Sequence, residues 1–207
     1  MIDNTEGRNM IEQIVVYDEQ LNKTGIEDRN TVHLNGNWHY VFHCWVYNKS
    51  RNEIVLQRRA ADKSLFPKRY DVSCAGHYSS EDTFKSVREL EEELGIKTSY
   101  EQLIYLRDFK DIFKANEIYD REVARVHLLI VDEFDPKPTT PEEIDSIAVC
   151  DLDDFIALIA GATSHISIKT VLGEATNKIL TGQMLVPREF PYYQNIFALI
   201  QSHITNL

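Results

Sequence analysis

Three glutamates stand at helical spacing in "RELEEELGI", residues 88–96. On a helix, Glu89, Glu92 and Glu93 lie at i, i+3 and i+4, so their carboxylates gather on one side. Converging carboxylate oxygens are the hard ligands that Mg²⁺ or Mn²⁺ requires. A solvated acidic face is the alternative interpretation. The pattern therefore indicates either a divalent-metal site or a charged helix surface.

The same stretch matches the second half of the Nudix box, a motif of one arginine, three glutamates, a glycine and two apolar residues. The matching positions are Arg88, Glu89, Leu90, Glu92, Glu93, Gly95 and Ile96. Only twelve positions separate Gly76 from Arg88, two fewer than in the family's pattern. Either Glu81 or Asp82 would supply the first acid of this shortened loop. The chain thus resembles the Nudix hydrolases.

This resemblance implies an α/β chain with the Nudix fold, an α/β/α sandwich around a mixed sheet. It implies hydrolysis of a diphosphate linkage, in a nucleotide-linked or isoprenoid-type substrate, by attack of water on phosphorus. Glu89, Glu92 and Glu93 would hold the cofactor, Mg²⁺ or Mn²⁺, with Glu92 also catalytic and Arg88 bracing the acids. Glu143, in a later loop, is a candidate for the catalytic base; an ordinary loop acid is the alternative.

Three further segments resemble the isopentenyl-diphosphate isomerase branch of the superfamily: 32–48, 66–78 and 120–130. In those isomerases, histidines and carboxylates bind a metal. The matching positions are His33, His39, His77, Asp120 and Glu122. Three imidazoles and two carboxylates suit Mn²⁺, Mg²⁺ or Zn²⁺. His43 and His127 lie within apolar strands, and we interpret them as structural.

The isomerases need a cysteine directly before their Gly-His pair, where this chain has Ala75; its cysteine is Cys74. A one-residue slip in a strand turns a side chain to the opposite face, so Cys74 is expected to be a buried apolar residue. The pattern therefore favours an isomerase-like Nudix hydrolase. An isomerase, or a catalytically weak module that binds ligand without turnover, is the alternative.

The chain has one dense basic stretch, "LQRRAADKSLFPKRY" (56–70). In the isomerase branch that the chain resembles, this segment borders the diphosphate pocket. Arg58 and Lys68 are candidates for contacts to phosphate oxygens, with Gly76 in the adjoining loop. Ordinary surface charge is the alternative interpretation.

The elements that must position these residues follow from the apolar patterning. A helix is predicted over 81–95, stopped by Gly95. Strands are predicted within 11–28 and over 40–48, 52–60, 70–78, 103–113, 122–134 and "SIAVCDL". The domain expected to carry the box (76–96) spans 1–160, and a helical C-terminal extension, 161–207, is expected to pack on it.

Composition limits the partners and the compartment. A net charge of −11 argues against a nucleic-acid polymer, and no apolar run is long enough to span a membrane. The partner that the resemblance implies is a small diphosphate compound. Three cysteines without CxxC spacing favour a reducing cytoplasm. The apolar stripe in "NIFALIQSHI" predicts core packing or a homodimer contact.

Overall fold

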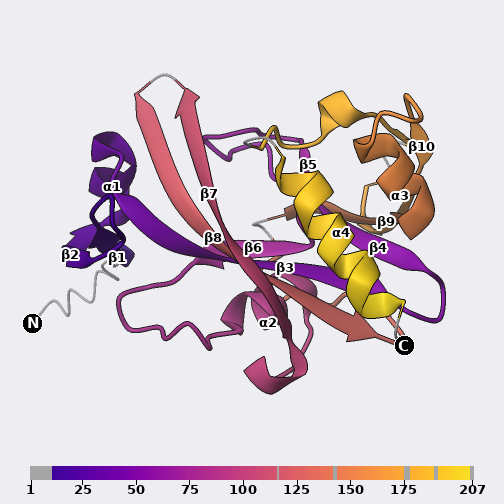
Figure 1. The fold of residues 1–207 in the computed structure, drawn as a ribbon, viewed down its shortest axis with the longest axis horizontal. Helices are drawn as coiled ribbons and strands as arrows, with labels where there is room; N and C mark the ends of the chain where they lie inside the picture. Colours follow the sequence, from indigo (N-terminus) through magenta and orange to yellow (C-terminus); the bar gives the residue numbers. More distant parts are fainter. Residues whose placement is uncertain (1–10, 116, 142–143, 175–177, 189–190, 206–207) are drawn as a thin grey trace, which may run out of the picture.

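The computed structural model describes residues 11–115, 117–141, 144–174, 178–188 and 191–205. Within them, ten strands form one mixed sheet (Figure 1), and two further strands form a short pair. The strands are β1 (Gln13–Tyr17), β2 (Lys23–Asp28), β3 (Trp38–Asn48), β4 (Glu53–Arg59), β5 (Tyr70–Asp71), β6 (Cys74–His77), β7 (Ile104–Ala115), β8 (Ile118–Val131), β9 (Ile144–Asp151), β10 (Ile166–Ser167), β11 (Lys169–Gly173) and β12 (Ile179–Leu180). The helices are α1 (Arg29–Asn35), α2 (Arg88–Leu94), α3 (Leu152–Ile159) and α4 (Tyr192–Ile204).

Strand β3 is the centre of the sheet. It pairs in parallel with β8 over its whole length, from Trp38 opposite Arg121 to Asn48 opposite Val131. Its aromatic and β-branched residues are buried on both faces, as the long apolar run predicts. This register fixes which side chains of β3 and β8 lie next to each other.

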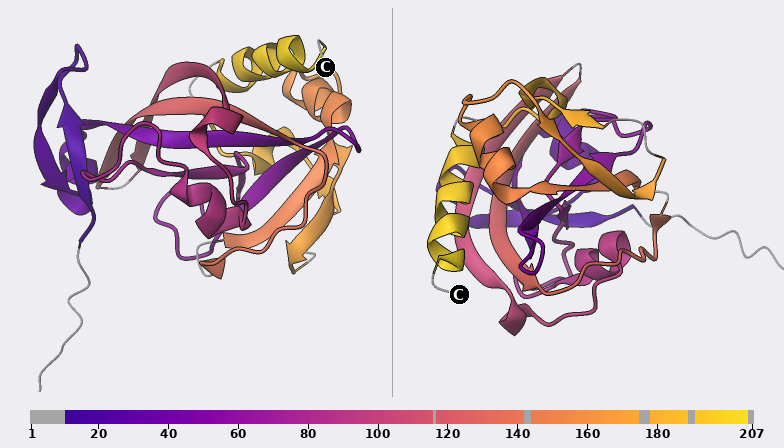
Figure 2. Two further views of the ribbon diagram at one scale, coloured as in Figure 1. Left: turned by 90° about the horizontal axis from the view of Figure 1, so that it is seen from below. Right: turned by 90° about the vertical axis from the view of Figure 1, so that its right-hand side faces the viewer.

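Alternate residues of β3 enter two apolar layers. Trp45 packs on Phe197 of α4, with ring centroids 4.8 Å apart, in the layer under α3 and α4. Phe42 belongs to the other layer, with Leu90 and Leu94 of α2. Helices therefore cover both faces of the sheet (Figure 2), which confirms the predicted α/β/α sandwich.

Strands β3 and β4 are hydrogen-bonded neighbours only near their turn, at residues 47–48 and 53–54. Beyond it they diverge, and the Ser73 hydroxyl bridges them: it accepts from the Val46 N–H at 2.9 Å and donates to the Val55 carbonyl at 2.6 Å. The predicted single strand over 70–78 is therefore two strands, because β5 pairs with β4 while β6 pairs with β3.

The predicted helix over 81–95 is wrong in its first half, since α2 begins only at Arg88. Residues 79–86 form turns instead. The Asp82 carboxylate accepts the Ser79 N–H at 2.9 Å, and the Ser86 N–H bonds to the Thr83 carbonyl. These turns satisfy the backbone without a helix. The end is as predicted, with Gly95 in the left-handed conformation (φ 71°).

The C-terminal region ends in α4 as expected, but the prediction of helix between α3 and α4 is wrong. Its β-branched residues form β10, β11 and β12 instead, and β11 joins the main sheet beside β9. The division of the chain into domains at residue 160 stays a prediction. Side chains of α3 and α4 share the apolar layer of the central strands.

Helix α1 has no counterpart in the sequence-based prediction, although both of its ends are marked. The Asp28 side chain caps the Thr31 N–H at 3.1 Å, and Gly36 ends the helix with φ 66°. The helix lies beside β8 (Figure 1), and its His33 Nε2 is 3.7 Å from Asp120 Oδ1 of that strand.

The longest helix that the structure describes, α4, has 13 residues, and none of the described helices could cross a bilayer.

Candidate active site

A cavity of about 1000 Å³ brings most of the predicted site together. Its walls come from α1, β3, the loop after β4, β6, α2, the hairpin of β7 and β8, and residues 186–188. Acidic, imidazole and basic side chains therefore share one space, although the most distant of them, Glu12 and Arg188, are 176 positions apart in the chain.

The acidic wall is built from α2 against the backbone of β6. Glu93, 4% exposed, accepts a hydrogen bond from the Ala75 N–H at 3.0 Å. A Cβ at position 76 would lie 2.1 Å from the Glu89 carboxylate. The Glu89 carboxylate can take this position only because residue 76 is a glycine without a side chain.

Arg88 braces the acids, as predicted. Its guanidinium lies 2.8 Å from Glu89 and 2.6 Å from Glu92, and it donates to the His77 carbonyl at 3.3 Å. Glu92 does not line the cavity. Its main-chain carbonyl accepts the N–H groups of Thr139 and Thr140. Glu143 lies outside the described residues.

Three histidines meet at one end of the cavity, where His33 and His77 line the wall and His39 is fully buried next to them. The rings of His33, His39 and His77 lie 5.2–5.3 Å apart, centroid to centroid, and their Nε2 atoms are buried and make no hydrogen bond. His39 Nδ1 lies 3.0 Å from the Asn37 carbonyl, which can only accept, so its proton is on Nδ1 and Nε2 has a lone pair. Burial lowers the pKa of His33 and of His39 to about 4, so both are neutral at pH 7.

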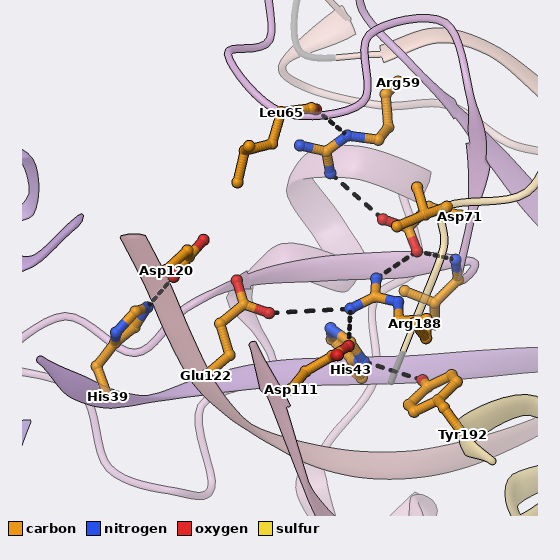
Figure 3. Close-up of polar contacts among 12 residues, drawn as sticks. His39, His43, Arg59, Leu65, Asp71, Asp111, Asp120, Glu122, Arg188 and Tyr192 are labelled. Atoms are coloured by element: carbon orange, nitrogen blue, oxygen red, sulfur yellow. Dashed lines mark hydrogen bonds and ion pairs between the residues drawn. The ribbon is translucent and has the colours of Figure 1, made fainter. Parts of the chain in front are cut away.

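Two carboxylates of β8 complete this group, called here the histidine–carboxylate cluster (His33, His39, His77, Asp120 and Glu122). Asp120 Oδ1 lies 3.6 Å from His39 Nε2, and the parallel register sets Glu122 beside His39 (Figure 3). Ligand atoms of the three histidines lie within 4.8 Å of one another, as do those of His39, Asp120 and Glu122. Burial raises the pKa of Asp120 to about 6, and burial together with Asp120 raises the pKa of Glu122. Unpartnered nitrogen and oxygen atoms of this kind fit a divalent cation.

Arg188, which the sequence did not reveal, lies next to the cluster on the side of Glu122. Its buried guanidinium pairs with Asp71, with Asp111 at 3.2 Å and with Glu122 at 3.8 Å (Figure 3). Burial would raise the pKa of Asp71, but Arg188 and Arg59 outweigh it and hold that pKa at about 2. No local motif marks Arg188, because its partners are distant in sequence.

The basic wall differs from the prediction at both positions. Arg58 and Lys68 both pair with Asp145, the former at 2.7 Å, and neither lines the cavity. Arg59 and Lys63 do line it. Gln57 and Arg59, two residues apart on β4, both line the cavity, and because side chains alternate along a strand, Arg58 points to the other face.

Cys74 and Ala75 lie as the one-residue slip predicts. Cys74 is fully buried opposite Cys44 in the layer under α2, whereas Ala75 lines the cavity opposite His43. His43 lines the cavity as well, so its location is not only structural. His127 is buried elsewhere, stacked on Phe42 with ring centroids 5.2 Å apart.

Known proteins share parts of this sequence and this fold. A family model described as the NUDIX domain matches residues 37–170. The chain is 27% identical to an uncharacterized Nudix hydrolase of Clostridium acetobutylicum, over 89% of this chain and 95% of that one. It is 30% identical to isopentenyl-diphosphate Delta-isomerase 1 of Photorhabdus laumondii, over 70% and 85%. A crystal structure from Deinococcus radiodurans shares the fold, with a TM-score of 0.51 at 22% identity, covering 78% of this chain and 93% of that one.

Proposed function

This chain belongs to the Nudix family of hydrolases, which act on diphosphate-containing substrates, and we propose that it uses a divalent metal to hydrolyse a nucleotide-linked or isoprenoid-type diphosphate. One observation carries the proposal: the buried carboxylates of Glu89 and Glu93 line the same cavity as Arg59 and Lys63. A diphosphate site needs basic side chains that bind the phosphate oxygens, and it needs carboxylates that hold a metal ion next to them.

Different residues of the cavity would bind the metal ion and the phosphate groups. Glu89 and Glu93 would hold Mg²⁺ or Mn²⁺, and Arg88 keeps the acids in place through its ion pairs. Arg59 and Lys63 would bind phosphate oxygens in place of the predicted Arg58 and Lys68. When bound, the cation neutralises phosphate charge and favours attack on phosphorus.

The reaction is a simple exchange at phosphorus. The water oxygen forms a new P–O bond while the bridging P–O bond breaks, and the bridging electron pair stays on the leaving phosphate. One water proton passes to a cavity carboxylate, Glu89 or Glu93 in this proposal. A catalytic role for Glu92 or Glu143 stays a prediction from the sequence.

The histidine–carboxylate cluster would hold a second cation of the Mn²⁺, Mg²⁺ or Zn²⁺ class. Two observations support this: the three orphaned Nε2 atoms, and burial that keeps His33 and His39 unprotonated at pH 7. Arg188 would orient Glu122 from below.

Isomerisation of isopentenyl diphosphate is the second candidate, favoured by this cluster and by the Photorhabdus relative's name. It requires a proton donor at the position of Ala75. The Cys74 thiol is buried in the apolar layer under α2 and does not line the cavity, and burial, followed by the neighbouring Glu93 carboxylate, raises its pKa well above the usual value. We therefore expect a Cys74→Ala protein to keep full activity, an outcome that an isomerase using this thiol would not give.

A turnover screen followed by ³¹P and ¹H NMR tests the proposal. It offers nucleotide sugars, dinucleotides, isopentenyl diphosphate and dimethylallyl diphosphate with Mg²⁺ or Mn²⁺. Phosphate release by the native protein supports hydrolysis. Interconversion of the two isoprenoid isomers would establish the second candidate. Tight binding without turnover of any compound would identify a binding module. A cytoplasmic location and a homodimer stay predictions from the sequence.

A further inference from the structure

We propose that His43 is a further catalytic residue, whose Nε2–H donates a hydrogen bond to a phosphate oxygen of the substrate while Tyr192 of the C-terminal helix fixes the imidazole tautomer. This inference rests on the proposed hydrolysis of a diphosphate in the same cavity. It gives the C-terminal segment, which carries no box residue, a part in the chemistry.

The strand geometry puts His43 on the cavity side of β3. Side chains alternate along a strand, so His39, Val41 and His43 share one face, and all border the cavity or its histidine–carboxylate cluster. His43 is paired across the ladder with Ala75, the residue whose N–H bonds to Glu93. A group at this position therefore lies across the ladder from the residue that ties β6 to α2, and Arg188 is near enough to lower its pKa.

Hydrogen bonding sets where the His43 proton lies. Its Nδ1 is 2.9 Å from the Tyr192 hydroxyl oxygen (Figure 3), and the Trp45 Nε1–H donates to that oxygen at 3.3 Å. A tyrosine hydroxyl has one proton to donate. Among the described residues, His43 Nδ1 is the acceptor recorded for it, so the hydroxyl donates there. The ring proton is therefore on Nε2, the nitrogen on the far side of the ring from Tyr192.

This tautomer is the opposite of the one in His39. His39 bonds through Nδ1–H to a carbonyl, which leaves a lone pair on Nε2 for a metal. His43 accepts at Nδ1, which leaves an Nε2–H for an anion. Burial, and then Arg188, lower the pKa of His43 well below 6.5, so the ring stays neutral. Two histidines of one strand thus take different ligands because their Nδ1 partners differ.

NMR of protein labelled with ¹⁵N-histidine tests the tautomer and the contact without turnover. We expect His43 to show a protonated Nε2 and an unprotonated Nδ1. We also expect its Nε2–H resonance to shift when Mg²⁺ and methylenediphosphonate, a non-hydrolysable diphosphate, are added. Tyr192→Phe keeps the ring but removes the donated proton, so a mixture of tautomers should appear. A protonated Nδ1 in the native protein would overturn the proposal.

Kinetics test the catalytic role. Loss of one preorganised donor typically costs about 10²–10³-fold in kcat, which is the fall expected for His43→Leu. His43→Gln, whose amide can present an N–H, should recover at least about tenfold of that loss, an effect that a purely structural role would not give. If bound methylenediphosphonate leaves the His43 resonance unmoved, the proposal fails even where the protein hydrolyses diphosphates. If the resonance shifts but no diphosphate is hydrolysed, the hydrolase proposal fails and the His43 contact stands.

Discussion

The Glu93 carboxylate accepts the Ala75 backbone N–H at 3.0 Å, on the side of β6 away from its partner β3. One side chain therefore does two things: it satisfies a buried main-chain donor and it presents negative charge to the cavity. The Nudix helix and the Cys-Gly-His position of the isomerases meet at this contact.

Glu93→Gln should separate these two roles. The amide oxygen can still accept the Ala75 N–H, but the charge that would hold a cation is gone. We expect kcat to fall at least about 10²-fold while the unfolding midpoint moves little. Glu91→Gln is the matched control, because exposed Glu91 pairs only with Lys97 among the contacts recorded, at 3.3 Å. Equal losses in both proteins would contradict a special role for Glu93.

Arg59→Ala should raise KM for a diphosphate substrate by about 10–100-fold, because the variant loses the binding free energy of one charge-assisted hydrogen bond. Arg58→Ala should change KM less than about twofold, because Arg58 faces Asp145 outside the cavity. Steady-state kinetics of the two proteins make the comparison. Arg59 also pairs with Asp71, so thermal unfolding of each variant must be measured alongside. A larger KM effect from Arg58 would restore the assignment made from sequence.

Mn²⁺ should stabilise the native protein through the histidine–carboxylate cluster. A ligand at about 100 times its Kd adds about 2.7 kcal/mol, which is several degrees in Tm for a chain of this length. His39→Ala should lose most of this shift, while His165→Ala, at an exposed site, should keep it. Differential scanning calorimetry with and without EDTA measures both. An undiminished shift in His39→Ala would place the metal elsewhere.

Metal-free protein should lose stability as the pH falls from about 6.5 to about 4. The folded pKa values of the buried histidines are lowered, so the unfolded chain takes up protons first and is favoured as pH falls. For His39, whose pKa is about 4, the effect is about 3 kcal/mol. Asp120 and Glu122 act in the opposite direction, because their pKa values are raised. Five histidines have lowered pKa values against these two carboxyl groups, so the histidines should dominate the pH dependence. They are His33, His39, His43, His77 and His127.

Urea unfolding in EDTA at pH 7.5 and at pH 5.0 checks this balance. We expect the lower midpoint at pH 5.0. A midpoint that rises on acidification would mean that protonation of the two carboxyl groups outweighs that of the histidines.

The sequence predicted those parts of the site that lie within short motifs. Glu89, Glu93 and Gly76 all line the cavity, and their spacing is local enough for the sequence to group them, while their roles stay predictions. The choice between Arg58 and Arg59 was not accessible, because alternation along β4 puts one of them inward but only the folded sheet shows which face of β4 borders the cavity. Arg188 and Tyr192 were missed because only tertiary folding brings them beneath β3 and β8.

Hydrolysis in H₂¹⁸O is the most direct test of the central claim, attack of water on phosphorus. With the diphosphate that the turnover screen identifies, mass spectrometry should find one ¹⁸O in a phosphate product, and Glu93→Gln should lose at least about 10²-fold of that product. Label in the organic alcohol would mean that a C–O bond is cleaved. Isomerised substrate without label in any product would mean that no hydrolysis occurs, and either result would contradict the account.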